Sequence, residues 1–211
     1  MALRLHAITL ADAMYDPPTD DGTGQNSRPK LIPFRDLCAV VSEQKAFALN
    51  ETNAELVGQH RAVVDAVFKG ATVLPAPVGV VFRASDVLKR WMELHYVSLT
   101  GALEFVEDRA VARVHVVRAD ASTNNREAGS DLAAAAAESL RALRRHAVAA
   151  VPLRLEEVTG LALSSAFLVE RSGWKAFLGA TDEQQSAHHL LKFNVSGPWA
   201  PYDFVHMQFG G

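Results

Sequence analysis

Histidine is the side chain in this sequence best suited to metal binding and proton transfer, and the chain contains eight of them. His188 and His189 are adjacent, and adjacent residues on a strand point to opposite faces, so they would form a poor chelate. The sequence has no His-Glu-x-x-His motif, no paired Cys-x-x-Cys motifs and no comparable zinc pattern. We therefore expect no metal-ligating residue and no cofactor.

Three other histidines were considered one by one. His60 lies on the apolar stripe of a predicted helix, so we expect it to be a packing residue. His95 and His115 have no carboxylate and nucleophile near them in the sequence that would nominate a catalytic triad. The sequence therefore predicts no catalytic residue, and we expect a protein that is not an enzyme.

Charged and glycine-rich stretches give no phosphate site. The segment Gly22–Gly24 neither follows a predicted strand nor opens a helix, as a dinucleotide loop would. The pairs Asp20-Asp21 and Glu156-Glu157 are most simply solvated. The Arg141–Arg145 cluster falls at the end of a predicted helix, where the helix dipole favours cations. An alternative stays open: a small-ligand-binding or enzymatic α+β protein that uses His115 and Arg141–Arg145.

Composition indicates a globular protein with an apolar core. The 211 residues are 49% hydrophobic and 21% charged, and the net charge of −3 gives no basic footprint for nucleic acid. No stretch approaches the roughly 18–20 apolar residues of a membrane helix, and the N-terminus does not read as a signal peptide. Cys38 is the only cysteine and cannot form an internal disulfide. These features favour a cytoplasmic protein that binds neither nucleic acid nor membrane.

Hydrophobic periodicity predicts mixed helices and strands in the first half. We expect strands over 3–10 and 37–42, an exposed loop over 12–30, and a strand, bend and strand over 72–82. Helices are predicted over 53–69, with Thr52 and Glu55 as a capping box and Gly70 as the stop, and from Ser85 to about residue 100. The apolar face of the second helix is expected to consist of the following residues: Val87, Leu88, Trp91, Leu94 and Leu99.

The second half predicts a ferredoxin-like β-α-β-α-β pattern. Its expected elements are a strand within 103–118, a polar loop over 119–129, a helix capped by Ser130 and ending near Pro152, a strand over Leu161–Glu170, a helix over Trp174–Ala187 and a strand over Leu190–Val195. We therefore expect an α+β protein of two mixed α+β domains, at residues 1-102 and 103-211, with an aromatic C-terminal tail.

The tail SGPWAPYDFV (196–205) concentrates three aromatic residues beside two prolines. Gly197 and Pro198 permit and fix a sharp entry, so we expect the tail to fold back on its own chain with Trp199 as the anchor. Aromatic residues are enriched in interface hot spots. The protein-interaction candidates are therefore Trp199, Tyr202 and Phe204.

Three segments resemble one known family when they are taken in order. FRDLCAVVS (34–42), VLPAPVGVVF (73–82) and GPWAPYDFV (197–205) are similar to motifs of the gas vesicle protein F/L (GvpF/GvpL) family. The chain departs from that pattern at Ala76-Pro77-Val78-Gly79, where the family has Val-Arg-Phe-Gly, and at Ala200, where the family has a second proline. The resemblance identifies a divergent member.

The resemblance implies a gas vesicle accessory protein with two α+β domains and no cofactor. It implies a minor structural or chaperone-like assembly role. The implied partners are the small hydrophobic gas vesicle shell protein and other gas vesicle accessory proteins, and the implied location is the cytoplasm, in association with the vesicle.

Overall fold

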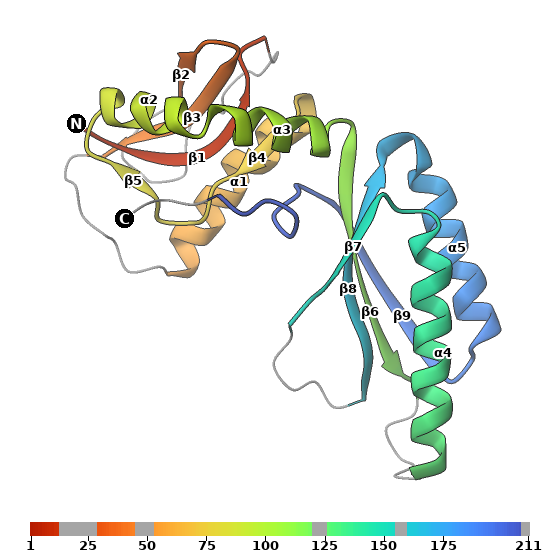
Figure 1. Cartoon of the computed structure of the whole chain (residues 1–211). Coiled ribbons are helices and arrows are strands. Elements are labelled where there is room, and N and C mark those ends of the chain that lie inside the picture. The colour runs from red at the N-terminus through yellow and green to blue at the C-terminus, as the bar shows by residue number, and fades with distance from the viewer. Residues whose placement is uncertain (13–28, 45–52, 120–125, 155–159, 208–211) are drawn as a thin grey trace. The chain divides into compact units, whose positions relative to one another are not determined.

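The chain forms two compact units, each with its own sheet and core (Figure 1). The computed structural model describes residues 1–12, 29–44, 53–119, 126–154 and 160–207. The first unit comprises Met1–Glu107 and the C-terminal segment from Ala200, and the second comprises Asp108–Trp199. The boundary expected after residue 102 falls inside a helix, α3 (Tyr96–Val106), and the tail expected in the second domain belongs to the first unit.

The first unit is built on an antiparallel sheet. Its strands are β1 (Ala2–Leu10), β2 (Lys30–Phe34), β3 (Leu37–Gln44), β4 (Val73–Pro75) and β5 (Val81–Phe82). The order is β2-β3-β1-β4, and β5 pairs with the start of β1 beside β4. The strands expected over 3–10 and 37–42, and the interrupted strand over 72–82, are confirmed, whereas β2 was not predicted.

A β-bulge at His6 sets the inward-facing residues of β1. The pairing with β3 shifts register between Leu5 and Ala7. Leu3 and Leu5 precede the bulge and Ile8 follows it, yet all three belong to one core cluster. Strict alternation would place Ile8 on the opposite face, so the extra residue keeps both ends of the strand facing the same core.

The divergent segment Ala76-Pro77-Val78-Gly79 continues the contact with β1 across the gap between β4 and β5. The Ala76 N–H donates to the His6 carbonyl at 2.9 Å, and the Leu5 N–H donates to the Val80 carbonyl at 2.9 Å. Ala76 is fully buried in the core cluster. Gly79 has φ of 90°, a backbone angle that glycine accepts readily.

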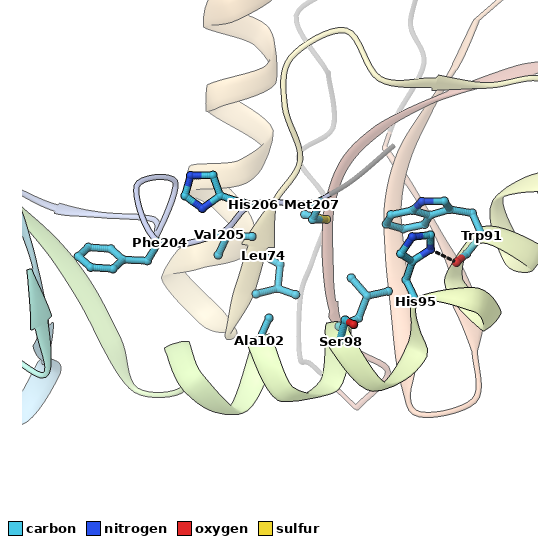
Figure 2. Close-up of a pocket in the computed structure, with 10 residues that line it drawn as sticks. Leu74, Trp91, His95, Ser98, Ala102, Phe204, Val205, His206 and Met207 are labelled. Atoms are coloured by element: carbon cyan, nitrogen blue, oxygen red, sulfur yellow. Dashed lines mark hydrogen bonds between the residues drawn. The ribbon is translucent and has the colours of Figure 1, made fainter. Parts of the chain in front are cut away.

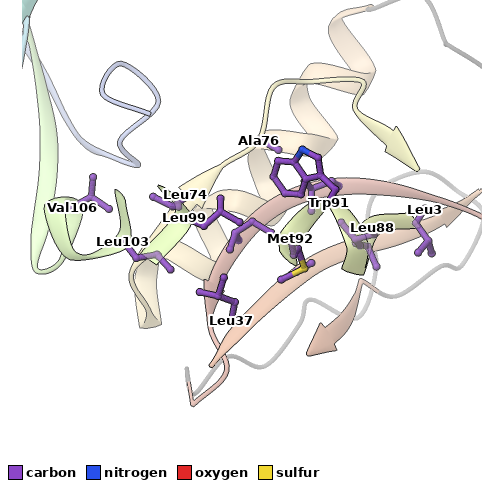
Figure 3. Packing of buried hydrophobic residues seen from close by; sticks show 14 residues of the cluster. Leu3, Leu37, Leu74, Ala76, Leu88, Trp91, Met92, Leu99, Leu103 and Val106 are labelled. Atoms are coloured by element: carbon purple, nitrogen blue, oxygen red, sulfur yellow. The ribbon is translucent and has the colours of Figure 1, made fainter. Parts of the chain in front are cut away.

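Helices cover both faces of this sheet. The core cluster joins one face to α2 (Ser85–Leu94) and α3 through Leu88, Met92 and Leu99 (Figure 3). The helix α1 (Ala54–Gly70) contacts β1 and β4 and buries an apolar stripe outside that cluster. Its N-cap is Asn53, whose Oδ1 accepts from the Leu56 N–H at 2.8 Å, and the expected cap Thr52 lies outside the described residues.

The helix expected from Ser85 to residue 100 is interrupted at His95. The His95 Nδ1 lies 2.9 Å from the Trp91 carbonyl, and because a carbonyl only accepts, Nδ1 is the donor. This side-chain bond uses a carbonyl of the helical ladder, which is a recognised cause of kinks. After the break, α3 runs to Val106, so residues 103–106, expected to be strand, are helical.

The second unit has a βαββαβ order. Its elements are β6 (Arg109–Arg118), α4 (Arg126–Arg144), β7 (Ala149–Pro152), β8 (Leu161–Glu170), a 3-10 turn η1 (Arg171–Gly173), α5 (Trp174–Ala187) and β9 (Leu191–Trp199). The antiparallel sheet has the order β7-β8-β6-β9, which is the ferredoxin-like arrangement. The sequence pattern lacked β7, and α4 begins at Arg126 rather than after Ser130.

The helices α4 and α5 pack on one face of this second sheet. The core cluster combines Val114 and Val116 of β6 with Leu143 of α4 and Phe177 of α5. Strand alternation then directs Arg113 and His115 of β6 to the face opposite the helices.

The Gly-Pro step of β9 is tightly packed. The pairing of β6 with β9 shifts register between Val111 and Arg113, opposite this step. Gly197 has φ of 132°, and a Cβ at this position would lie 2.6 Å from the Val111 carbonyl oxygen and 2.9 Å from Cη2 of Trp174. Only glycine fits here without displacement of backbone.

We expect Gly197→Ala to lower the free energy of unfolding by about 2 kcal/mol or more, because strained φ and a backbone clash add together. The measurement is urea denaturation followed by circular dichroism. The matched control is Gly179→Ala in α5 of the same unit, where an added Cβ meets nothing within 4 Å and helix propensity predicts a gain of about 0.5–1 kcal/mol. Equal effects of the two substitutions would contradict the argument.

Candidate functional site

The three aromatic residues of the tail are divided between the two units. Trp199 ends β9, pairs with Val111, and donates from Nε1 to Ser196 Oγ at 3.1 Å. Tyr202 and Phe204 follow in the segment that belongs to the first unit. Trp199 is thus an edge residue of the second sheet, whereas the tail after it belongs to the first unit rather than to the 103-211 domain in which it was expected. The tail does fold back on its own chain.

The end of the tail lies over an apolar groove of the first unit, which we call the strap groove (Figure 2). The groove is formed by Leu74 of β4, Trp91 of α2, His95 at the break between α2 and α3, and three residues of α3: Ser98, Leu99 and Ala102. Residues 204–207, which we call the strap, form its other side. A cavity of about 280 Å³ remains between strap and groove.

The floor of the strap groove is mostly apolar and rigidly held. Trp91 and Leu99 belong to the core cluster of the first unit, and the imidazole of His95 stacks on the Trp91 ring with centroids 4.9 Å apart. Because His95 Nδ1 donates to the Trp91 carbonyl, only Nε2 of its neutral ring can accept a bond from a bound group. The groove therefore suits apolar side chains better than a charged ligand.

An exposed apolar stripe runs along α2 and α3, and its residues are neighbours in sequence of residues that line the strap groove. Leu94 is 76% exposed and Val97 is 81% exposed, and Phe105, two turns further along α3, is 41% exposed. Leu94 was expected on the buried face of a continuous helix, and so was Val87, which is 46% exposed. Leu88, Trp91 and Leu99 of that expected face are buried.

The β2–β3 turn is fixed beside this stripe by a charged and aromatic cluster. The Arg35 guanidinium lies over the Phe34 ring at 5.3 Å and over the Tyr96 ring at 4.9 Å from the centroids. The Tyr96 hydroxyl donates a short hydrogen bond to Asp36, and that bond is the main reason that the pKa of Tyr96 is raised. Phe34, Arg35 and Asp36 belong to the FRDLCAVVS motif, so the motif contacts Tyr96 at the start of α3.

The residues of the alternative ligand site are not brought together. His115 lies on the sheet face opposite the helices, with Nδ1 3.0 Å from Ser164 Oγ. The Arg141–Arg145 cluster lies at the C-terminal end of α4, which packs on the other face of the same sheet, and Arg141, Arg144 and Arg145 are exposed. His115 and the Arg141–Arg145 cluster therefore do not line a common pocket.

His60 is buried between α1 and the first sheet, as expected of a packing residue. It is 1% exposed, and its ring lies 5.2 Å from that of His6, whose Nε2 is 2.9 Å from Ser42 Oγ. Burial lowers the pKa of His60 to about 4, and the positive charge of Arg4 acts in the same direction. The Ala76 backbone opposes this shift, although no hydrogen bond to the ring has normal geometry among the described residues.

Within the described ranges, no three histidine, cysteine or acidic side chains gather into a group able to hold a metal ion. The helices in those ranges include none that is both long and apolar enough to cross a membrane. Several sequence expectations lie outside the described residues: the loop at residues 13–28, with Asp20-Asp21 and Gly22–Gly24, and the pair Glu156-Glu157.

Comparisons with known proteins agree with this architecture. The family model described as gas vesicle synthesis protein GvpL/GvpF matches residues 5–131 and 122–206. Gas vesicle protein F2 of Halobacterium salinarum is 28% identical over 196 residues, covering 90% of this chain and 86% of the relative.

Two crystal structures share the fold. The gas vesicle protein GvpF from Anabaena sp. PCC7120 superimposes with a TM-score of 0.78 at 14% identity, over 100% of this chain and 98% of the other. GvpF from Microcystis aeruginosa gives a TM-score of 0.74 at 12% identity, over 98% and 99% of the two chains.

These findings define the class as gas vesicle proteins with two α+β units. The chain belongs to the gas vesicle synthesis protein GvpL/GvpF family. The resemblance noted in the motifs of residues 34–42, 73–82 and 197–205 is confirmed across the chain, and so is the α+β fold.

The strap groove itself was not predicted. Ser98 and Ala102 carry no chemical signal in the sequence, and His95 was considered only as a catalytic residue. The one available signal was the aromatic tail, which showed that an apolar segment needs a docking surface without showing where that surface lies.

The buried imidazole of His60 makes stability depend on pH. Its pKa is about 4 in the folded chain and near the ordinary 6.5 when unfolded, so between these values the unfolded state binds the extra proton. Stability is therefore full above pH 6.5 and falls as the pH is lowered to about 4, by about 3 kcal/mol from this group.

We expect His60→Leu to flatten this dependence, because leucine fits the apolar stripe of α1 and does not titrate. The measurement is the free energy of unfolding by urea at pH 7, 5.5 and 4.5. His146→Leu, at an exposed position, is the control and should leave the slope unchanged. An equal slope in wild type and His60→Leu would show that another group governs the acid sensitivity.

Proposed function

We propose that this chain is a gas vesicle accessory protein that acts in vesicle assembly by binding the hydrophobic shell protein and other vesicle proteins. The observation that carries the proposal is the exposed apolar stripe of α2 and α3, which includes Leu94 and Val97, in a member of the GvpL/GvpF family. A hydrophobic shell protein would otherwise aggregate before it is incorporated. Burial of apolar surface provides about 25 cal/mol per Å², enough for transient protection.

The role is one of binding rather than turnover. The polar groups that the sequence offered for an enzymatic alternative, His115 and Arg141–Arg145, belong to opposite faces of the second sheet. The groups that line the strap groove are mostly apolar. Co-purification of the shell protein with the tagged full chain tests the proposed association directly.

We expect binding of the shell protein to depend on the apolar stripe and only slightly on salt. Leu94→Gln with Val97→Gln should weaken binding at least several-fold, because both side chains are largely exposed and apolar. The matched control is Lys89→Gln with Arg90→Gln, two exposed polar positions of α2. Affinity is measured by biolayer interferometry at 50 and 300 mM salt. A steep salt dependence, or a larger effect of the control pair, would point to charged faces instead.

The tail aromatics are expected to separate stability from binding. Trp199→Ala should lower the melting temperature, because Trp199 pairs with Val111 in the second sheet and its indole donates to Ser196. Tyr202→Ala should weaken partner binding with a nearly unchanged melting temperature, as expected of an interface aromatic. Calorimetry and the binding assay are run on both variants. If neither variant changed either quantity, the tail would have no part in folding or association.

A further inference from the structure

The strap packs against the first unit through its side chains. Val205 and Met207 are half-buried and pack against the core cluster of the first unit. The tail forms local turns through backbone hydrogen bonds from the Tyr202 N–H to the Ala200 carbonyl at 2.8 Å and from the Phe204 N–H to the Pro201 carbonyl at 3.1 Å. Among the described residues, 204–207 make no hydrogen bond to the groove. A segment held in this way can detach from the groove without breaking the backbone hydrogen bonds of a β-sheet.

The strap also fills its groove incompletely. The cavity of about 280 Å³ left between the two is below the roughly 300–1,000 Å³ of small-molecule sites. It is lined by Leu74, Leu99 and Ala102 from the body of the unit, so its walls suit one or two apolar side chains. Unfilled apolar volume is a packing deficit, which a better-fitting segment would remove.

The groove residues of α2 and α3 alternate along the chain with exposed apolar residues. In Figure 2, Ser98 and Ala102 of α3 point toward the strap. Val97 immediately precedes Ser98 and is 81% exposed, and Leu94 precedes His95 and is 76% exposed. A longer apolar segment that entered the groove would therefore find further apolar contacts along its rim, which the strap leaves uncovered.

We propose that the strap groove is the docking site for an extended apolar segment of the shell protein, and that the strap occupies this site in the free chain. The strap itself, with Phe204, Val205 and Met207, shows the kind of segment that the groove accepts. This inference rests on the proposed function. Strap and shell segment compete, so the apparent affinity for the shell protein is reduced by the fraction of chains in which the strap is docked.

The first test loosens the strap in the full chain. Val205→Ser with Met207→Ser removes the side chains that hold the strap on the core cluster. We expect at least about a fivefold tighter apparent Kd for shell protein fused to a solubility tag, because more grooves are open. Lys69→Ser, at an exposed position of α1 outside the groove and the strap, is the control and should leave the Kd unchanged.

The second test fills the groove. Ala102→Phe places a ring in the cavity and should weaken binding of the shell protein, while circular dichroism confirms that the fold is retained. A chain truncated after Asp203 should bind as tightly as the loosened variant, and a synthetic peptide of residues 200–207 should compete with the shell protein for it. The control peptide carries serine at positions 204, 205 and 207.

The outcomes distinguish the two proposals. If the wild-type chain binds the shell protein but the loosened variant binds equally or more weakly, and Ala102→Phe has no effect, strap competition is wrong and the proposed function stands. If no variant and no wild-type chain binds the shell protein, the proposed function fails and this inference fails with it.

Discussion

The first unit depends on one strand, β1, which is paired along both edges and buried on both faces. It pairs with β3 on one side and with β4 and β5 on the other, so each of its hydrogen-bonding edges is satisfied by the chain itself. The bulge at His6 lets nine residues serve two cores at once: Leu5 and Ile8 face α2 and α3, whereas His6 meets His60 of α1. Burial of polar groups is costly at such a position: His6 reaches Ser42 Oγ through Nε2, whereas the ring nitrogens of His60 have no hydrogen-bond partner among the described residues.

The sheet edges are built to resist further strand addition. In both sheets, edge strands contain proline: Pro33 in β2, Pro75 in β4, Pro152 in β7 and Pro198 in β9. Proline offers no N–H to a neighbouring strand, so it makes an edge a poor template for pairing with another chain. Edges of this kind favour contacts through helices and grooves over pairing with another strand. The exposed stripe on α2 and α3 and the side-chain packing of the strap are consistent with that preference.

The sequence was most informative where hydrophobic periodicity was long and regular. The strands at residues 3–10 and 161–170 and the helix at 174–187 follow from local patterns, as does the ferredoxin-like character of the second unit. The strands β2 and β7 are short edge strands with no distinct period, so they were missed. The break at His95 coincides with a side-chain bond from Nδ1 to the Trp91 carbonyl, and hydrophobic periodicity does not report such a bond. The tail was recognised as a segment that must dock, but its assignment to the first unit is a long-range property that depends on Val205 and Met207 meeting a core built a hundred residues earlier in the chain.

The first unit is complete only when the strap, which comes from the C-terminal segment, has packed onto its core. The first unit is formed by two separate segments of the chain, Met1–Glu107 and the segment that begins at Ala200. Until the final residues are in place, Leu74, Leu99 and the rest of the strap groove lack the side chains of the strap over them. The groove is therefore an apolar surface that the chain exposes early and covers late. On the groove floor, the rings of Trp91 and His95 stack with centroids 4.9 Å apart, a contact that does not involve the strap. If the groove keeps its shape without the strap, a second apolar segment can enter it. The packing that lets the first unit form before the strap docks would then also let another segment take the place of the strap.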